Sequence, residues 1–234
     1  MENSFDYITE NYNRIYNEIE AAKAKYRKPS DHVDFMAVTK TVAPEAVNHA
    51  IHCGISLLGE NRVQEYLSKR DFYDPSATVH FIGHLQTNKI RDIIEKVSMI
   101  ESVDSLHLAQ ALSRECEKRG MEMDILLQVN IGKEETKSGF YEEEVLDAVK
   151  RVAELPGLKA KGLMTIPPRF SGRLYFEKMQ ELFLLCKEKK IEGADFSVLS
   201  MGMSDDYREA IACGSTQIRL GRAIFGKRPA VKSH

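Results

Sequence analysis

The stretch Asp34-Phe35-Met36-Ala37-Val38-Thr39-Lys40-Thr41 is apolar and partly β-branched, and it follows a polar segment at 28–31. This composition predicts a short buried strand that ends near Lys40. The ordinary interpretation of such a lysine is a side chain that reaches water from the end of the strand. The alternative is a partly desolvated and therefore activated amine, which is suited to forming a Schiff base with a carbonyl.

Similar apolar runs recur along the chain, and amphipathic segments with helical spacing separate most of them. Eight strands that alternate with helices indicate parallel pairing, because each parallel crossover needs a connecting segment. They fit an α/β fold, a closed (β/α)8 TIM barrel, with an open doubly wound sheet as the alternative. The runs lie near 34–39, 55–58, 78–82, 98–101, 124–129, 159–164, 196–199 and 217–220.

A helix is predicted to precede the barrel. From about 4 to 27, apolar residues recur at spacings of three and four, as they do in an amphipathic helix. No linker, low-complexity segment or long run of like charge divides the sequence. We therefore expect one domain over 1–234, with the barrel proper at about 33–228.

Composition argues against several classes of partner. The net charge of -2 gives no general attraction to nucleic acid or to a membrane surface, and the apolar runs are too short to span a bilayer. The first residues lack the basic and apolar segments of a signal peptide, so we expect a cytoplasmic protein. Without a C-x-x-C pair, we expect reduced thiols and no metal site. The cysteines are Cys53, Cys116, Cys186 and Cys213.

Polar side chains follow every predicted strand. In a (β/α)8 barrel the chemistry lies at the carboxyl ends of the strands. A single polar residue in a loop is usually only solvated, but eight consecutive polar strand ends favour a functional site. The residues at these ends include Lys40, Asn61, His84, Asp104, Asn130, Thr165, Ser200, Ser204 and Arg222.

The last two loops indicate what kind of ligand the site takes. The segment Gly202-Met203-Ser204-Asp205-Asp206 precedes a helical pattern, so Ser204 is expected to cap a helix. A helix start offers N–H groups to an anion, and Gly221 and Arg222 would add donors after the last strand. TIM barrels often bind phosphate in these loops. The ordinary interpretation is a simple cap, and the two aspartates disfavour a phosphate unless their side chains turn away.

Arg219 is expected to point into the barrel. In the segment 216–221, Gln217 and Arg219 share one face of the strand. Helices cover the other, apolar face, so Arg219 lies inside, where a charge needs a partner. A Schiff-base lysine, a phosphate cradle and an inward arginine together describe a site for pyridoxal 5′-phosphate (PLP). A protonated arginine would hold the pyridine nitrogen as an acceptor, which favours holding the cofactor, or racemase-type chemistry, over transamination.

Motifs in nearly every loop resemble those of one known family. Between about 33 and 228 the chain is similar, in register, to the YggS/PROSC family of pyridoxal phosphate homeostasis proteins. The motifs that carry the resemblance are Ala37-Val38-Thr39-Lys40, Gly59-Glu60-Asn61, His80-Phe81-Ile82-Gly83, Leu85-Gln86-Thr87-Asn88-Lys89, Lys137-Ser138-Gly139, Gly162-Leu163-Met164-Thr165-Ile166-Pro167, Leu199-Ser200-Met201-Gly202-Met203-Ser204-Asp205-Asp206 and the segment from Gly214 to Gly226.

The resemblance implies a barrel like the N-terminal domain of alanine racemase, with PLP bound to Lys40 as a Schiff base. It assigns Ser204 and Gly221 to the phosphate, Arg219 to the ring nitrogen and Asn61 to the pocket wall. It also implies a protein that keeps free PLP low and supplies it to PLP-dependent client enzymes, without established catalytic turnover. The full set of cofactor-binding residues that we expect is Lys40, Asn61, Met201, Ser204, Arg219, Gly221 and Arg222.

Two enzymatic functions compete with this interpretation, a weak amino-acid racemase and a Schiff-base aldolase on the same barrel. Racemases of this fold need a second base from a β-domain and a partner subunit. The chain ends at Lys232-Ser233-His234, so we expect no β-domain, and we expect a monomer. An aldolase would leave the phosphate cradle unexplained. His84 replaces a frequent proline of the family, and the loop at 168–172 looks shorter than usual.

Overall fold

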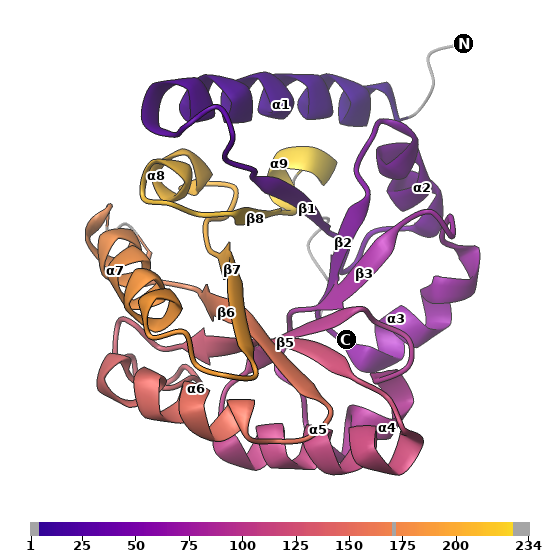
Figure 1. The fold of residues 1–234 in the computed structure, drawn as a ribbon. Coiled ribbons are helices and arrows are strands. Elements are labelled where there is room, and N and C mark those ends of the chain that lie inside the picture. Colours follow the sequence, from indigo (N-terminus) through magenta and orange to yellow (C-terminus); the bar gives the residue numbers. More distant parts are fainter. Residues whose placement is uncertain (1–4, 170–171, 227–234) are drawn as a thin grey trace.

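Eight parallel strands form a closed barrel in chain order, as the sequence predicted (Figure 1). The computed structural model describes residues 5–169 and 172–226, so part of the loop at 168–172 and the chain end at 232–234 lie outside the described residues. Because β8 pairs with β1, an open sheet is excluded. The strands are β1 (Asp34–Val38), β2 (Leu57–Glu60), β3 (Thr78–Phe81), β4 (Met99–Val103), β5 (Met123–Val129), β6 (Leu158–Thr165), β7 (Ala194–Ser200) and β8 (Gln217–Leu220).

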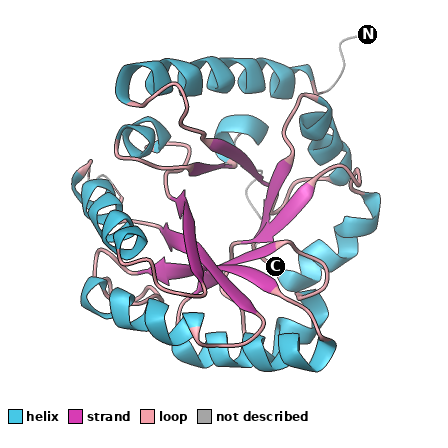
Figure 2. Cartoon of the chain, in the orientation of Figure 1, coloured by secondary structure: helices cyan, strands magenta, loops and turns pink. Residues whose placement is uncertain are grey.

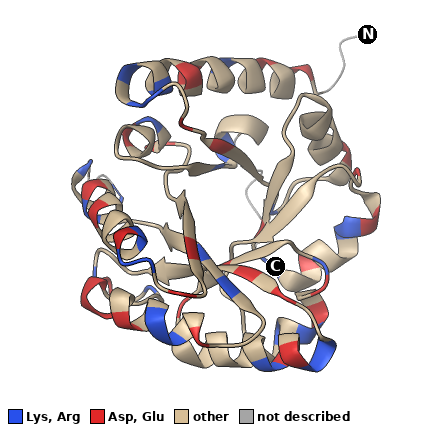
Figure 3. Ribbon diagram, viewed as in Figure 1, with Lys and Arg blue, Asp and Glu red and all other residues tan. Residues whose placement is uncertain are grey.

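Helices surround the barrel and cover its outer face (Figure 2). Acidic and basic residues are interspersed around this ring, in keeping with the small net charge (Figure 3). In the described part of the chain, no helix is long and apolar enough to cross a membrane. The helices are α1 (Asp6–Tyr26), α2 (Pro44–His52), α3 (Val63–Lys69), η1 (Arg70–Phe72), η2 (Thr87–Lys89), α4 (Ile90–Ile93), α5 (Leu106–Arg119), η3 (Glu142–Glu144), α6 (Val145–Ala153), α7 (Leu174–Glu188), α8 (Tyr207–Ala212) and α9 (Arg222–Phe225).

Helix α1 confirms the predicted amphipathic helix and packs where the barrel closes. Its buried face, which includes Ile8, Ile15 and Ile19, follows the spacing of three and four residues. The helix contacts α8 and α9, the last helices of the chain. Asn11 donates from Nδ2 to the carbonyl of Ile224 at 2.9 Å. The first helix therefore braces the segments that follow β7 and β8.

The strands alternate between two environments. Residues on the outer faces join the main core between the strands and the helices, whereas the barrel interior holds two small apolar clusters. One cluster contains Met36, Val38 and Ile82, and the other contains Met99, Leu126 and Met164. Fully or nearly buried polar residues also lie on inward-facing positions: His80, Glu101, Ser200, Gln217 and Arg219. The interior is thus a packed core with a polar part.

Strand β6 contains an irregularity that depends on glycine. The register with β7 shifts between Ala160 and Gly162. Gly162 has φ +148°, and a Cβ there would lie 1.8 Å from the carbonyl oxygen of Val198. A side chain at this position would meet backbone that cannot move without breaking the sheet.

We predict that Gly162→Ala lowers the free energy of unfolding by about 3 kcal/mol or more, because overpacking adds to an unfavourable backbone conformation. Gly120→Ala is the matched control. Gly120 ends α5 with φ +63°, and a Cβ there would meet nothing within 4 Å. Only the cost of the left-handed backbone conformation, about 1–2 kcal/mol, then remains. Urea unfolding of the two variants measures the difference, and equal losses would contradict the steric account.

Candidate functional site

Lys40 lies in the turn that follows β1, at the carboxyl end of the barrel. Met36 and Val38 face the interior, and the alternation of strand side chains puts Lys40 on the same face. The Thr39 N–H donates to the Gly59 carbonyl at 3.2 Å, which extends the ladder to the lysine. Thr41 has φ +62°, a left-handed conformation that turns the chain away from the strand. Lys40 is half-buried, which is compatible with both interpretations of a lysine at a strand end.

A cluster of polar residues near the carboxyl ends of β1 and β2 holds this turn in place. The Thr39 hydroxyl donates to Glu60 Oε1 at 2.6 Å, and the Tyr73 hydroxyl donates to the same oxygen at 2.7 Å. Glu65 accepts from the backbone N–H of Thr41 and pairs with Lys69. The residues on both sides of Lys40 are therefore hydrogen-bonded to glutamate side chains, Thr39 through its hydroxyl and Thr41 through its backbone N–H. We did not anticipate this cluster, because its members come from three separate segments.

Asn61 follows β2 and contains a polar atom without a partner. Among the described residues, Glu60 Oε2 and Asn61 Oδ1 are the buried side-chain atoms that make no hydrogen bond. A Cβ on Gly83 would lie 2.0 Å from the Asn61 carbonyl oxygen, so the ends of β2 and β3 are in close contact. A buried acceptor without a donor is costly. The orphaned amide oxygen therefore fits a ligand with a hydroxyl or amine that donates to it.

Arg219 is inside the barrel, as predicted, and it is 4% exposed. Its Nη1 donates to Ser200 Oγ at 2.7 Å, and its Nη2 donates to the carbonyl of Thr165 at 2.7 Å. Burial lowers the pKa of this guanidinium, while the negative charges of Glu101 and Asp206 oppose the shift. An arginine remains protonated under such conditions. The barrel interior thus contains a fixed cation on the strand next to β1.

The prediction that Ser204 caps a helix is wrong. The chain forms a turn through 204–206 and α8 begins at Tyr207, with Asp206 in the N-cap position. Asp206 is held inside the turn, where it accepts from the Met203 N–H at 2.6 Å. The Ser204 hydroxyl instead accepts from the Ala223 N–H at 3.1 Å. Ser204 therefore joins the loop after β7 to the helix after β8, which are the two segments predicted to hold a phosphate.

Three further residues were predicted to bind the cofactor in these loops, and the structure gives each a different environment. Gly221 immediately precedes α9. Arg222 forms an ion pair with Asp205, so the aspartate turns towards it. The side chain of Met201 is fully buried in the main core, so only its backbone could touch a ligand in the barrel. The structure thus brings Ser204 and Gly221 into one region and gives Arg222 a competing partner.

Glu101 is the principal residue that the sequence analysis missed. It occupies the middle of β4, has 0% exposure and accepts three hydrogen bonds inside the barrel. The signal was present, because a glutamate in the strand Met99–Val103 lies on the same face as Met99. Its partners could not be identified from one sequence, since they lie 21 to 116 residues away.

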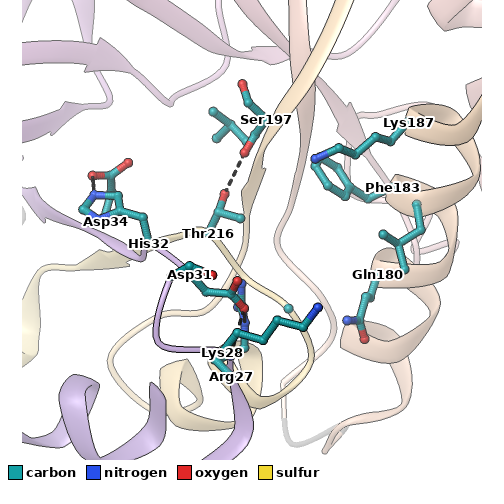
Figure 4. A pocket seen from close by; sticks show the side chains of 14 residues that line it. Arg27, Lys28, Asp31, His32, Asp34, Gln180, Phe183, Lys187, Ser197 and Thr216 are labelled. Carbon is teal, nitrogen blue, oxygen red and sulfur yellow. Dashed lines mark hydrogen bonds and ion pairs between the residues drawn. The ribbon is translucent and has the colours of Figure 1, made fainter. Parts of the chain in front are cut away.

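A separate hollow of about 680 Å³ opens at the opposite end of the barrel (Figure 4). Its lining comes from the segment before β1 and the start of that strand, from α7, from the middle of β7 and from the segment before β8. Lys28 and Lys187 lie on its walls, together with Asp31 and Gln180. The hollow is lined by none of the residues predicted to bind the cofactor, so it does not belong to the candidate site.

Known proteins resemble this chain over nearly its whole length. Residues 11–229 match the family model described as alanine racemase, N-terminal domain. A protein of Aquifex aeolicus (strain VF5) named pyridoxal phosphate homeostasis protein is 37% identical over 224 residues, which cover 94% of this chain and 97% of that protein.

Two solved structures extend the similarity to three dimensions. An unknown protein from Bifidobacterium adolescentis is 33% identical, with a TM-score of 0.89 over 94% of this chain and 95% of that chain. PipY of Synechococcus elongatus PCC7942, solved with PLP bound, is 31% identical, with a TM-score of 0.76 over 89% of this chain and 99% of that chain.

The cluster behind Lys40 gives a prediction about pH. Burial raises the pKa of Glu60, and the hydrogen bonds from Thr39 and Tyr73 offset only part of the effect. Above the ordinary pKa of a glutamate the unfolded chain loses this proton first. Stability should therefore fall as the pH rises from that value through the raised pKa of the folded protein.

We expect Glu60→Gln to remove this part of the pH dependence, because an amide does not ionise. The free energy of unfolding in urea should then fall less in the variant than in the wild type between about pH 4 and about pH 8. Glu192→Gln, at an exposed position, serves as the control. An identical pH dependence in the wild type and in Glu60→Gln would show that Glu60 ionises normally.

Proposed function

The chain belongs to the alanine racemase N-terminal domain family, and from this we propose that it binds PLP on Lys40 and serves in PLP homeostasis. Relatives at 36–37% identity are named pyridoxal phosphate homeostasis proteins, and the similar protein PipY has been solved with PLP bound. The function that the residues support is to hold PLP reversibly and to supply it to enzymes that require it.

One observation carries the assignment of the site. Lys40 follows β1, and Arg219 lies on β8, the strand that pairs with β1. Arg219 is buried inside the barrel, and the alternation along β1 assigns Lys40 to the same side. A lysine amine is the group that binds a PLP aldehyde, and a guanidinium is one of the two kinds of group that pair with its pyridine nitrogen. The orphaned Oδ1 of Asn61 would accept from the ring hydroxyl. The residues present therefore fit the cofactor.

The loops after β7 and β8 would hold the phosphate. The Ser204 hydroxyl already lies against the backbone of α9, and Gly221 directly precedes that helix. A hydroxyl and backbone N–H groups are suitable donors to a phosphate. The Arg222–Asp205 ion pair would have to rearrange before Arg222 could contribute. We therefore expect Arg222 to contribute less to phosphate binding than Ser204 and Gly221 do.

We propose a carrier rather than an enzyme. PLP supplies an electrophilic aldehyde and an electron-withdrawing ring when it is bound. An arginine at the ring nitrogen leaves that nitrogen unprotonated, which weakens the ring as an electron sink. Arg219 thus favours retention and release of the cofactor over turnover of amino acids.

The first prediction of this proposal concerns Lys40. Borohydride reduction of the PLP-loaded protein, followed by peptide mapping, should place the adduct on Lys40. Lys40→Ala should fold with wild-type stability, because a side chain at a strand end contributes little packing, yet it should lose the visible absorbance of bound PLP. Lys89→Ala, at a surface lysine, is the control. An adduct found mainly on another lysine would overturn the assignment.

The second prediction concerns the phosphate. A hydrogen bond to a charged group contributes about 1.5–3 kcal/mol. Ser204→Ala should therefore weaken PLP binding about ten-fold or more, while binding of unphosphorylated pyridoxal changes little. Ser105→Ala is the matched control, because Ser105 caps α5 by accepting from the Leu108 N–H at 3.2 Å. That variant should lose about 1 kcal/mol of stability and keep its preference for PLP.

An equal loss of affinity for PLP and for pyridoxal in Ser204→Ala would place the phosphate elsewhere. Titration followed by absorbance or fluorescence measures both affinities. Urea unfolding of the apoprotein separates them from any loss of stability caused by the missing bond to Ala223.

A further inference from the structure

The interior of the barrel contains a hydrogen-bonded network centred on Glu101. Oε1 of Glu101 accepts from His80 Nδ1 at 2.7 Å and from Gln217 Nε2 at 2.6 Å. Its Oε2 accepts from the Ser200 hydroxyl at 2.6 Å. The same hydroxyl accepts from Arg219 Nη1 at 2.7 Å and from Gln217 Nε2 at 3.0 Å. Four strands, β3, β4, β7 and β8, contribute to this network.

The geometry fixes which atom carries each proton. Arginine and the glutamine Nε2 can only donate, so Ser200 Oγ accepts from Arg219 and Gln217 and directs its own proton to Glu101. Glu101 then accepts three hydrogen bonds and acts as a carboxylate. His80 must donate from Nδ1, because the carboxylate offers no proton. The network thus has one self-consistent arrangement.

The carboxylate of Glu101 lies near Arg219, but the two side chains are joined through Ser200. Ser200 stands between the carboxylate and the guanidinium, and it bonds to both. A direct pair would draw the arginine towards the carboxylate. With the hydroxyl between them, Nη1 and Nη2 are held by Ser200 and Thr165, and the orientation of the guanidinium plane is set.

The neighbours of Glu101 stabilise its charged form. Burial alone would raise the pKa of Glu101, but the hydrogen bond from His80 and the nearby charge of Arg219 outweigh burial, and the pKa lies below its ordinary value. A contribution to stability is a weak reason for such a network. Buried ion pairs often contribute less stability than apolar side chains of equal volume, and apolar clusters occupy other parts of the interior.

We propose that Glu101 is a positioning residue, which acts through Ser200 and Gln217 to hold Arg219 in the orientation that meets the pyridine nitrogen of PLP. This inference rests on the proposed function, because it takes PLP as the ligand. It adds residues of β4 and β7 to a site otherwise built from strand ends and loops.

Two variants test the proposal in the apoprotein and in the loaded protein. Glu101→Gln keeps the shape but replaces an acceptor by a donor, and Ser200→Ala removes the intervening hydroxyl without changing a charge. Each should weaken PLP binding about ten-fold, the equivalent of one strong hydrogen bond, and shift the absorbance maximum of bound PLP. The double variant should be no worse than the more affected single variant, because both changes cut the same connection.

A second measurement needs no cofactor. In the apoprotein, the Arg219 side-chain N–H signals in nitrogen-15 spectra, assigned with Arg219→Lys, should exchange slowly with water. They should broaden or disappear in Glu101→Gln and in Ser200→Ala. Glu115→Gln is the matched control, because Glu115 is a buried carboxylate of α5 that pairs with Arg119 and does not face the barrel interior.

The outcomes separate the two proposals. If the wild type fails to bind PLP, the proposed function fails, and the apoprotein signals still test whether Glu101 orders Arg219. The inference is overturned if Glu101→Gln lowers stability but leaves the Arg219 signals, the absorbance maximum and the PLP affinity unchanged. Additive losses in the double variant would also overturn it. Ser200→Ala, the smaller change, keeps the test available if Glu101→Gln does not fold.

Discussion

Arg219 brings a positive charge into the middle of a barrel, where water cannot solvate it. A buried charge persists only if hydrogen bonds and an opposite charge replace the lost water. Ser200, Thr165 and the nearby Glu101 provide these replacements. The Ser200 hydroxyl also accepts from Gln217 Nε2 at 3.0 Å, so the network links β7 and β8 at the point where their backbones pair.

The fold followed from the sequence because it depends on local patterns. The apolar run near 34–39 and its seven successors mark the strands, and segments with helical spacing separate most of them. The inward position of Arg219 also followed, because strand alternation with Gln217 leaves only one face for each residue. Lys40 could be placed at the mouth of the barrel for the same reason.

Other features depend on partners that are distant in sequence or on the geometry of one turn. Ser204 has the residue type and position of a helix cap, but three turn residues delay α8 and leave its hydroxyl to Ala223. Glu60 and Glu101 are both wholly buried glutamates, yet burial raises the pKa of Glu60 whereas donors and charges lower that of Glu101. The residue type does not reveal which environment applies.

The brace formed by α1 has a consequence for how the molecule assembles. The Tyr207 hydroxyl donates to Glu18, 189 residues earlier, and Asn11 bonds to Ile224 across 213 residues. A contact between residues so far apart in sequence closes a long loop, and closing that loop costs chain entropy. The segments around α8 and α9 should therefore reach their final positions late in folding, after the strands between them are paired. The end of the barrel that the ligand would occupy is then the part whose order depends most on the whole chain being in place.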